Sequence, residues 1–107
     1  MSFATNAKKV WTGKTIPGQT NWQKYTGSMA GVYVDVDTAE AGFTSIPIYL
    51  TSLGGDACHW ETTGATSVYQ STTTGFRVYV KFSSGAALTP AKANENKWHI
   101  NWIGIEL

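Results

Sequence analysis

The chain has 107 residues, a formal net charge of +1 and only 14% charged residues, so its length allows one hydrophobic core. No basic run exceeds the pair Lys8-Lys9, which argues against nucleic acid or an anionic membrane as partner, because phosphate binding needs several convergent cations. The single cysteine, Cys58, has no partner for an intrachain disulfide. We therefore expect one domain over residues 1–107, held together by packing or by association with other copies.

The first half of the chain predicts three strands, because its apolar and polar residues alternate with a period of two. The first is a weak strand over residues 9–15. The second covers residues 32–37, where three valines share one face and the polar side chains share the other. The third is centred on an apolar stripe that we expect to face the core, namely Ile46, Ile48 and Leu50. Pro47 then faces the opposite way, which indicates a strand start or a sheet edge.

The second half predicts a weak strand over residues 65–70 and two stronger ones. In residues 76–82, an apolar stripe is opposed by Arg77, Tyr79 and Lys81. The last strand, residues 97–107, is apolar on both faces, so it is expected to be buried on both sides or to meet another subunit. Between these two strands, residues 86–96 are expected to form a long loop rather than one short helical turn, and such loops tend to carry function.

Six or seven short strands separated by turns rich in glycine, proline and serine predict an all-β fold. The expected architecture is an antiparallel β-sandwich. The first nine residues lack the apolar segment of a signal peptide, and no apolar run has the length of a transmembrane helix.

Two groups of side chains could form a calcium site or a nucleophile–base pair, but each also has a simpler interpretation. Asp35 and Asp37 share a strand face near Glu40, but the spacing lacks the glycine turn and the distal glutamate of a calcium loop. A solvated sheet face is therefore favoured. Cys58 adjoins His59, but neighbours on a strand point to opposite faces, so a nucleophile–base pair is not favoured. The sequence predicts no enzymatic activity, no metal and no cofactor.

Residues 54–61 hold the most informative local pattern, in which two glycines precede His59, Trp60 and Glu61. Carbohydrate recognition places an aromatic face against the apolar side of a pyranose, while polar groups bond the ring hydroxyls. Alternatively, Trp60 closes the end of the sandwich and His59 holds the loop in place. The residues themselves leave both interpretations open.

Three stretches, taken together with their order and spacing, carry a family resemblance. They are residues 43–53 (FTSIPIYLTSL), 71–76 (STTTGF) and 100–106 (INWIGIE). They are similar to the F-x-x-x-P-x-V-x-x-S-L strand, the turn ending in T-G-F and the terminal I-x-W-x-x-x-E strand of the H-type lectin domain. That domain is the fold of snail agglutinins and of the C-terminal domain of discoidins. Residues 11–13 and 21–22 fit the family's first strand and following tryptophan more loosely.

The resemblance implies a six-stranded antiparallel sandwich that forms trimers or hexamers and binds N-acetylgalactosamine-type sugars between protomers. It implies contacts in the loop 26–31, with Ser28 and Gly31 as the expected residues. A family arginine aligns with Ser67, and a family Trp–His pair aligns with residues 83–84. This chain instead has a longer insertion there, through residue 96, from which we take Asn94 and Glu95 as candidate contacts.

Without the arginine and the aromatic pair, the N-acetylgalactosamine specificity is not carried over to this chain. His59 and Trp60 are the hypothesised replacement pair. The expected function is a non-enzymatic lectin that binds cell-surface glycans as a homotrimer or hexamer, because linked weak sites raise avidity by roughly 10² to 10⁴. The alternative is a trimeric structural or receptor-binding domain of a phage tail fibre or surface appendage. Either role implies an extracellular or virion-associated location.

Overall fold

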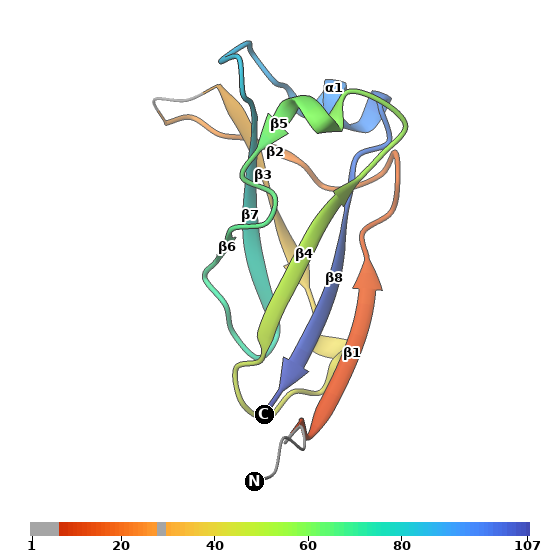
Figure 1. Cartoon of the computed structure of the whole chain (residues 1–107), viewed down its shortest axis with the longest axis vertical. Helices are drawn as coiled ribbons and strands as arrows, with labels where there is room; N and C mark the ends of the chain where they lie inside the picture. Colours follow the sequence, from red (N-terminus) through yellow and green to blue (C-terminus); the bar gives the residue numbers. More distant parts are fainter. Residues whose placement is uncertain (1–6, 28–29) are drawn as a thin grey trace, which may run out of the picture.

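Residues 7–27 and 30–107 are described by a computed structural model, in which two antiparallel sheets are stacked face to face (Figure 1). The strands are β1 (Lys9–Lys14), β2 (Gln23–Lys24), β3 (Gly31–Asp37), β4 (Ile48–Gly54), β5 (Thr62–Thr63), β6 (Val68–Tyr69), β7 (Gly75–Phe82) and β8 (His99–Glu106). The helical segments are the 3-10 helices η1 (Ala39–Ala41) and η2 (His59–Glu61) and the α-helix α1 (Pro90–Glu95). The predicted antiparallel β-sandwich is confirmed.

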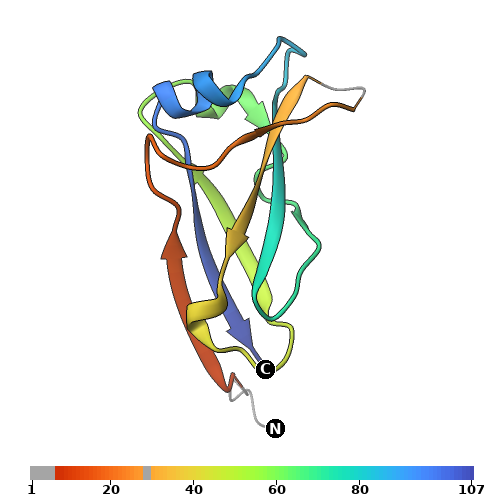
Figure 2. The ribbon, with the colours of Figure 1, turned by 180° about the vertical axis from the view of Figure 1, so that it is seen from behind.

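The first sheet has three strands in the order β1-β8-β4, and the second has five, with β2, β3, β7 and β5 in order and β6 also paired to β7. Seen from the front and from behind, α1 and β5 lie at the end of the sandwich opposite the C-terminus (Figures 1 and 2). Three of the strands, β2, β5 and β6, are only two residues long, so the long strands β3 and β7 form the body of their sheet.

The core lies between the sheets and follows the predicted stripes of β3, β7 and β8. The valines of β3 are buried against Phe76, Val78 and Val80 of β7. From the other sheet, Ile100 and Trp102 of β8 are buried, with Trp98 fully buried just before the strand. The indole of Trp98 donates to the carbonyl of Ala57 at 2.8 Å, which satisfies its N–H in the core.

The predicted orientation of β4 is wrong. Pro47 and Tyr49 face the core, whereas the three residues expected to be buried are exposed: Ile46, Ile48 and Leu50. Tyr49 decides the orientation, because its ring packs on Phe76 at 4.5 Å between centroids. Its hydroxyl also donates to the Thr72 carbonyl at 2.8 Å and bonds the Thr38 hydroxyl at 2.7 Å. A large ring whose hydroxyl finds hydrogen-bond partners takes the core side in place of the branched aliphatic residues.

The expected loop over residues 86–96 contains a helix, which is a second correction. Thr89 caps α1 by accepting from the backbone N–H of Lys92 at 3.2 Å, and Pro90 occupies the first turn. Buried Leu88 and Ala93 attach this segment to the end of the sandwich. Within residues 7–27 and 30–107, no helix has the length and apolarity required to span a membrane.

Candidate ligand-binding cleft

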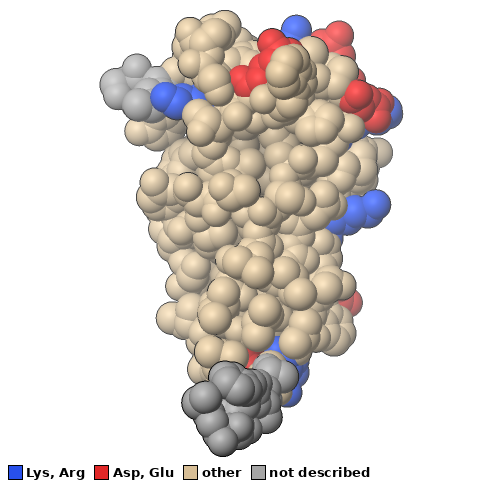
Figure 3. Space-filling view, in the orientation of Figure 1, with Lys and Arg blue, Asp and Glu red and all other residues tan. Residues whose placement is uncertain are grey.

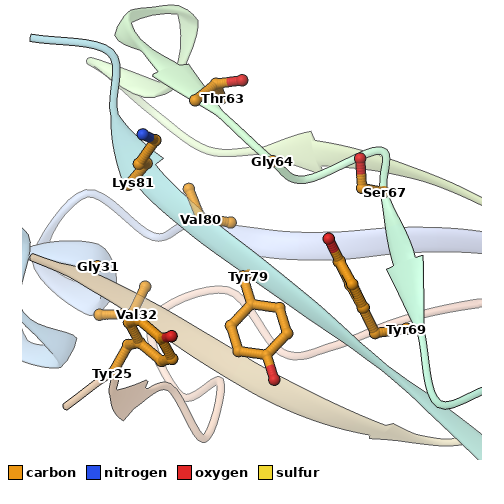
Figure 4. A pocket seen from close by; sticks show the side chains of 10 residues that line it. All are labelled: Tyr25, Gly31, Val32, Thr63, Gly64, Ser67, Tyr69, Tyr79, Val80 and Lys81. Atoms are coloured by element: carbon orange, nitrogen blue, oxygen red, sulfur yellow. The ribbon is translucent and has the colours of Figure 1, made fainter. Parts of the chain in front are cut away.

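A cleft of about 460 Å³ lies on the outer face of the five-stranded sheet (Figure 4). It is lined by Tyr25, Gly31, Val32, Thr63, Gly64, Ser67, Tyr69, Tyr79, Val80 and Lys81. β7 supplies its floor, while the start of β3 and the residue after β2 form one side. The segment from β5 to β6 forms the other side. Its volume is within the range of sites that hold small molecules.

Four of the five tyrosines gather around this cleft, with Tyr79 at the centre. The Tyr79 ring lies 5.5 Å from that of Tyr25 and 5.1 Å from that of Tyr69, at interplanar angles of 81° and 87°. Figure 4 shows Tyr79 between these two side chains. Tyr33, opposite Tyr79 on β3, adds a fourth ring at 5.8 Å. Edge-to-face pairs of this kind stabilise one another by about 0.5–1.5 kcal/mol each beyond their buried area.

An ion pair holds the edge of this tyrosine cluster in place. Arg77 of β7 donates to both carboxylate oxygens of Asp35 on β3, at 2.7 and 2.8 Å. The hydrogen bond from Arg77 holds the pKa of Asp35 below its ordinary value. The same guanidinium lies 4.2 Å from the centre of the Tyr33 ring, a cation–π contact. Through these contacts with Asp35 and Tyr33, Arg77 helps to fix the position of the Tyr33 ring beside the cleft.

Two glycines bring the backbone close to β7 at the cleft. A Cβ on Gly64, whose φ is +108°, would lie 2.4 Å from the carbonyl oxygen of Tyr79. A Cβ on Gly31 would lie 2.6 Å from the carbonyl oxygen of Val80. Only glycine permits these approaches, and no side chain rises from either position beside the tyrosines.

The cleft combines aromatic carbon with hydrogen-bonding groups. Hydroxyls come from its three tyrosines and from Thr63 and Ser67, and Lys81 supplies an ammonium group. Ligand sites of this type are mainly apolar with a few convergent polar groups. Among the described residues that line the cleft, none carries a carboxylate, an imidazole or a thiol.

The structure brings together two of the residues expected from the family resemblance. Gly31 at the start of β3 and Ser67 before β6 both line the cleft, on its two sides. Ser67 ends a turn in which its N–H donates to the Gly64 carbonyl at 3.0 Å. Ser28, the third expected residue of this group, lies outside the described residues.

His59 and Trp60 lie apart from the cleft, on η2 at the end of the sandwich. Trp60 is 86% exposed, so the alternative in which it closes the end of the sandwich is wrong. The carbonyl of His59 accepts from the Thr62 hydroxyl at 2.6 Å. Its buried Nδ1 has no hydrogen-bond partner among the residues described. Neither side chain lines the cleft with Gly31 and Ser67.

Asn94 and Glu95 lie on α1 and do not line the cleft either. The Asn94 amide accepts from the backbone N–H of Thr20 at 3.1 Å and donates to the Thr20 carbonyl at 2.9 Å. This pair of bonds ties α1 to the segment before β2. Glu95 is exposed.

Sequence reasoning missed the tyrosines as a site, although one signal was available. Tyr33 and Tyr79 lie on the polar faces of strands whose other faces are apolar, and aromatic residues there need a neighbour or a ligand. Tyr25 and Tyr69 gave no such signal, because only the fold brings them beside Tyr79.

The acidic residues considered for calcium have partners within the chain. Asp35 is paired with Arg77, and Asp37 accepts from the backbone N–H of Ala39 at 2.9 Å. In the part of the chain that the structure describes, no group of three or more potential metal ligands lies together. Comparison with protein-family models, curated proteins and solved structures finds no match to this chain.

Proposed function

We propose that this domain is a glycan-binding module whose sugar site is the tyrosine cleft. The observation that carries the proposal is the convergence of two independent indications on one place. The family resemblance points to Gly31 and Ser67, and these positions flank Tyr25, Tyr69 and Tyr79 in the cleft. Tyrosine rings offer an apolar face to the C–H side of a pyranose, while the nearby hydroxyls bond its polar edge.

A glycan array followed by NMR titration of the selected sugar tests the proposal. We expect wild-type protein to bind, and Tyr79→Ala to weaken binding by at least about tenfold, because the central ring of the cluster is lost. Tyr79→Phe keeps the ring, so it is expected to retain most of the affinity. Circular dichroism shows whether each variant is folded.

Trp60→Ala is the matched comparison, since it removes an exposed ring from the other candidate surface. It is expected to leave the affinity within about twofold of wild type. Loss of binding in Trp60→Ala but not in Tyr79→Ala would move the site to η2. No array signal from folded wild-type protein would contradict the glycan-binding function.

Multivalency is part of the proposal, and the outer face of the three-stranded sheet supports it. Ile105 of β8 is paired with Val10 on one side and with Ile48 on the other, and Ile103 is paired with Leu50. Over β4 and β8 the middle of this face carries no charged side chain, whereas charges gather at the ends and along one side (Figure 3). Uncharged apolar faces of this kind are typical of subunit contacts.

The same face supports the second candidate function, a trimeric domain of a phage tail fibre or surface appendage. In that role, holding three chains together is the main task and surface recognition is secondary. A stable oligomer without any glycan signal would favour this assembly function over the lectin function.

A further inference from the structure

We infer that the tyrosine cleft takes a pyranose that carries a carboxylate, such as a uronic acid or a sialic acid, with Lys81 binding the carboxylate. This inference rests on the proposed glycan-binding function and adds the chemical class of the sugar. It comes from the charges and the hydrogen-bonding groups that line the cleft, taken together.

Among the described residues that line the cleft, Lys81 is the only charged one. It lies on β7 between Gly31 of β3 and Thr63 of β5, and on the Gly31 side no side chain stands beside it. Figure 4 shows Lys81 and Thr63 at one end of the cleft, beyond the tyrosines. A sugar stacked on the tyrosines therefore has a cation within reach of one of its ends.

The other charged groups nearby do not neutralise Lys81. Asp35 is held by Arg77 in a bidentate pair, and neither residue lines the cleft. Glu61, which precedes β5, is not a lining residue. Within residues 7–27 and 30–107, Lys81 forms no ion pair. The lining of the cleft thus has a net charge of +1.

The hydrogen-bonding groups of the cleft also favour a ligand that carries a carboxylate. An ammonium group only donates, whereas the hydroxyls of Tyr, Ser and Thr both donate and accept. Among the described residues that line the cleft, no side chain is a carboxylate or an amide, so hydroxyl oxygens are the only side-chain acceptors there. A carboxylate offers about four acceptor positions and forms charge-assisted bonds with an ammonium group, so it matches this lining.

Matched pairs of sugars test the inference directly. Methyl glucuronide is compared with methyl glucoside, which differs by the carboxylate alone, and methyl sialoside with its carboxyl-reduced form. Binding is followed by NMR titration of the full chain at pH 7. The acidic member of one pair or of both is expected to bind about three- to tenfold more tightly, because Lys81 is partly exposed. The pair that shows the preference identifies the class of acid.

Variants of Lys81 separate its charge from its packing. In Lys81→Met the preference for the acidic sugar is expected to fall to about one, whereas Lys81→Arg keeps it. Lys92→Met, which removes an exposed lysine from α1, is the control and is expected to keep the full preference. Dispersed amide spectra establish that the variants are folded.

The outcomes separate a failure of the carboxylate specificity from a failure of the proposed glycan-binding function. Equal affinity for acidic and neutral sugars, with both dependent on Tyr79, overturns the carboxylate specificity and leaves the glycan-binding function standing. An acidic preference that survives in Lys81→Met also overturns the role of Lys81. Failure of the folded protein to bind these four probes and every glycan of the array overturns both.

Discussion

Glu106 is a buried carboxylate that holds a loop rather than a ligand. Its side chain accepts from the backbone N–H of Thr44 at 2.6 Å and of Ser45 at 3.3 Å, and from the Thr44 hydroxyl at 3.3 Å. The backbone bond from Thr44 is the main reason that its pKa is lowered. The terminal glutamate of β8 thus anchors the loop that leads into β4.

This bonding predicts a pH dependence of stability. Because the pKa of Glu106 is lower in the folded chain than its ordinary value of 4.5, its contribution is present above that value and is lost as the pH falls through the folded pKa. Glu106→Gln is therefore expected to lower the melting temperature at pH 7, and the difference from wild type is expected to narrow at pH 3. Thermal denaturation followed by circular dichroism at both pH values measures this difference in melting temperature.

Glu95→Gln, on the exposed side of α1, controls for the loss of a carboxylate at the surface. A constant difference between wild type and Glu106→Gln from pH 7 to pH 3 would show that the ionised carboxylate does not hold the loop. The hydrogen bond from Arg77 also lowers the pKa of Asp35, so the stability that Asp35 contributes is likewise lost as the pH falls.

At the scale of elements, the amide of Asn94 bonds α1 to the segment before β2. A helix of six residues is too short to be stable by itself, so it depends on tertiary contacts. The two bonds between Asn94 and the backbone of Thr20 provide such a contact, and buried Ala93 packs beneath it. This attachment explains why the insertion forms ordered structure instead of the long loop that was predicted.

Asn94→Ala is expected to lower the free energy of unfolding by about 1–3 kcal/mol, because two backbone groups of Thr20 lose their partners. Urea denaturation measures the loss. Glu95→Ala, at the next position, is expected to change stability by no more than about 0.5 kcal/mol. If Asn94→Ala instead weakened glycan binding with unchanged stability, Asn94 would be a ligand contact as the sequence suggested.

At the scale of the molecule, the two sheets present different outer faces. The five-stranded sheet carries the tyrosines and the Asp35–Arg77 pair, whereas the three-stranded sheet exposes Ile48 and Leu50, at 48% and 54%. We expect the first face to bind the ligand and the second to contact other copies. Such a division would leave every cleft of an oligomer open to solvent, rather than between protomers as the resemblance implies.

Light scattering coupled to size-exclusion chromatography tests this arrangement. Wild-type protein is expected to elute with three times the mass of one chain, and Leu50→Lys as a folded monomer, because the substitution places a charge in the apolar face. Ala87→Lys, on an exposed loop elsewhere, is expected to leave the trimer intact. A wild-type monomer at micromolar concentration would contradict both the multivalent lectin and the assembly domain.

The fold class and most of the core follow from patterns within the sequence. Alternation in β3, β7 and β8 is a local property of strands, since side chains at i and i+2 share a face, and the buried residues of these strands follow it. Gly31 and Ser67, which the resemblance gave as expected contacts, both line the cleft, and their role in binding stays a prediction.

The buried face of β4 and the position of the cleft depend on contacts between segments that are distant in the sequence. Both faces of β4 carry residues that could be buried, so the choice depended on whether Tyr49 could reach Phe76 and the Thr72 carbonyl. Likewise, Tyr25 and Tyr69 meet Tyr79 only because strands distant in sequence pair with β7. Contacts between distant segments depend on the packing of the whole chain, which a periodic pattern within one strand does not specify.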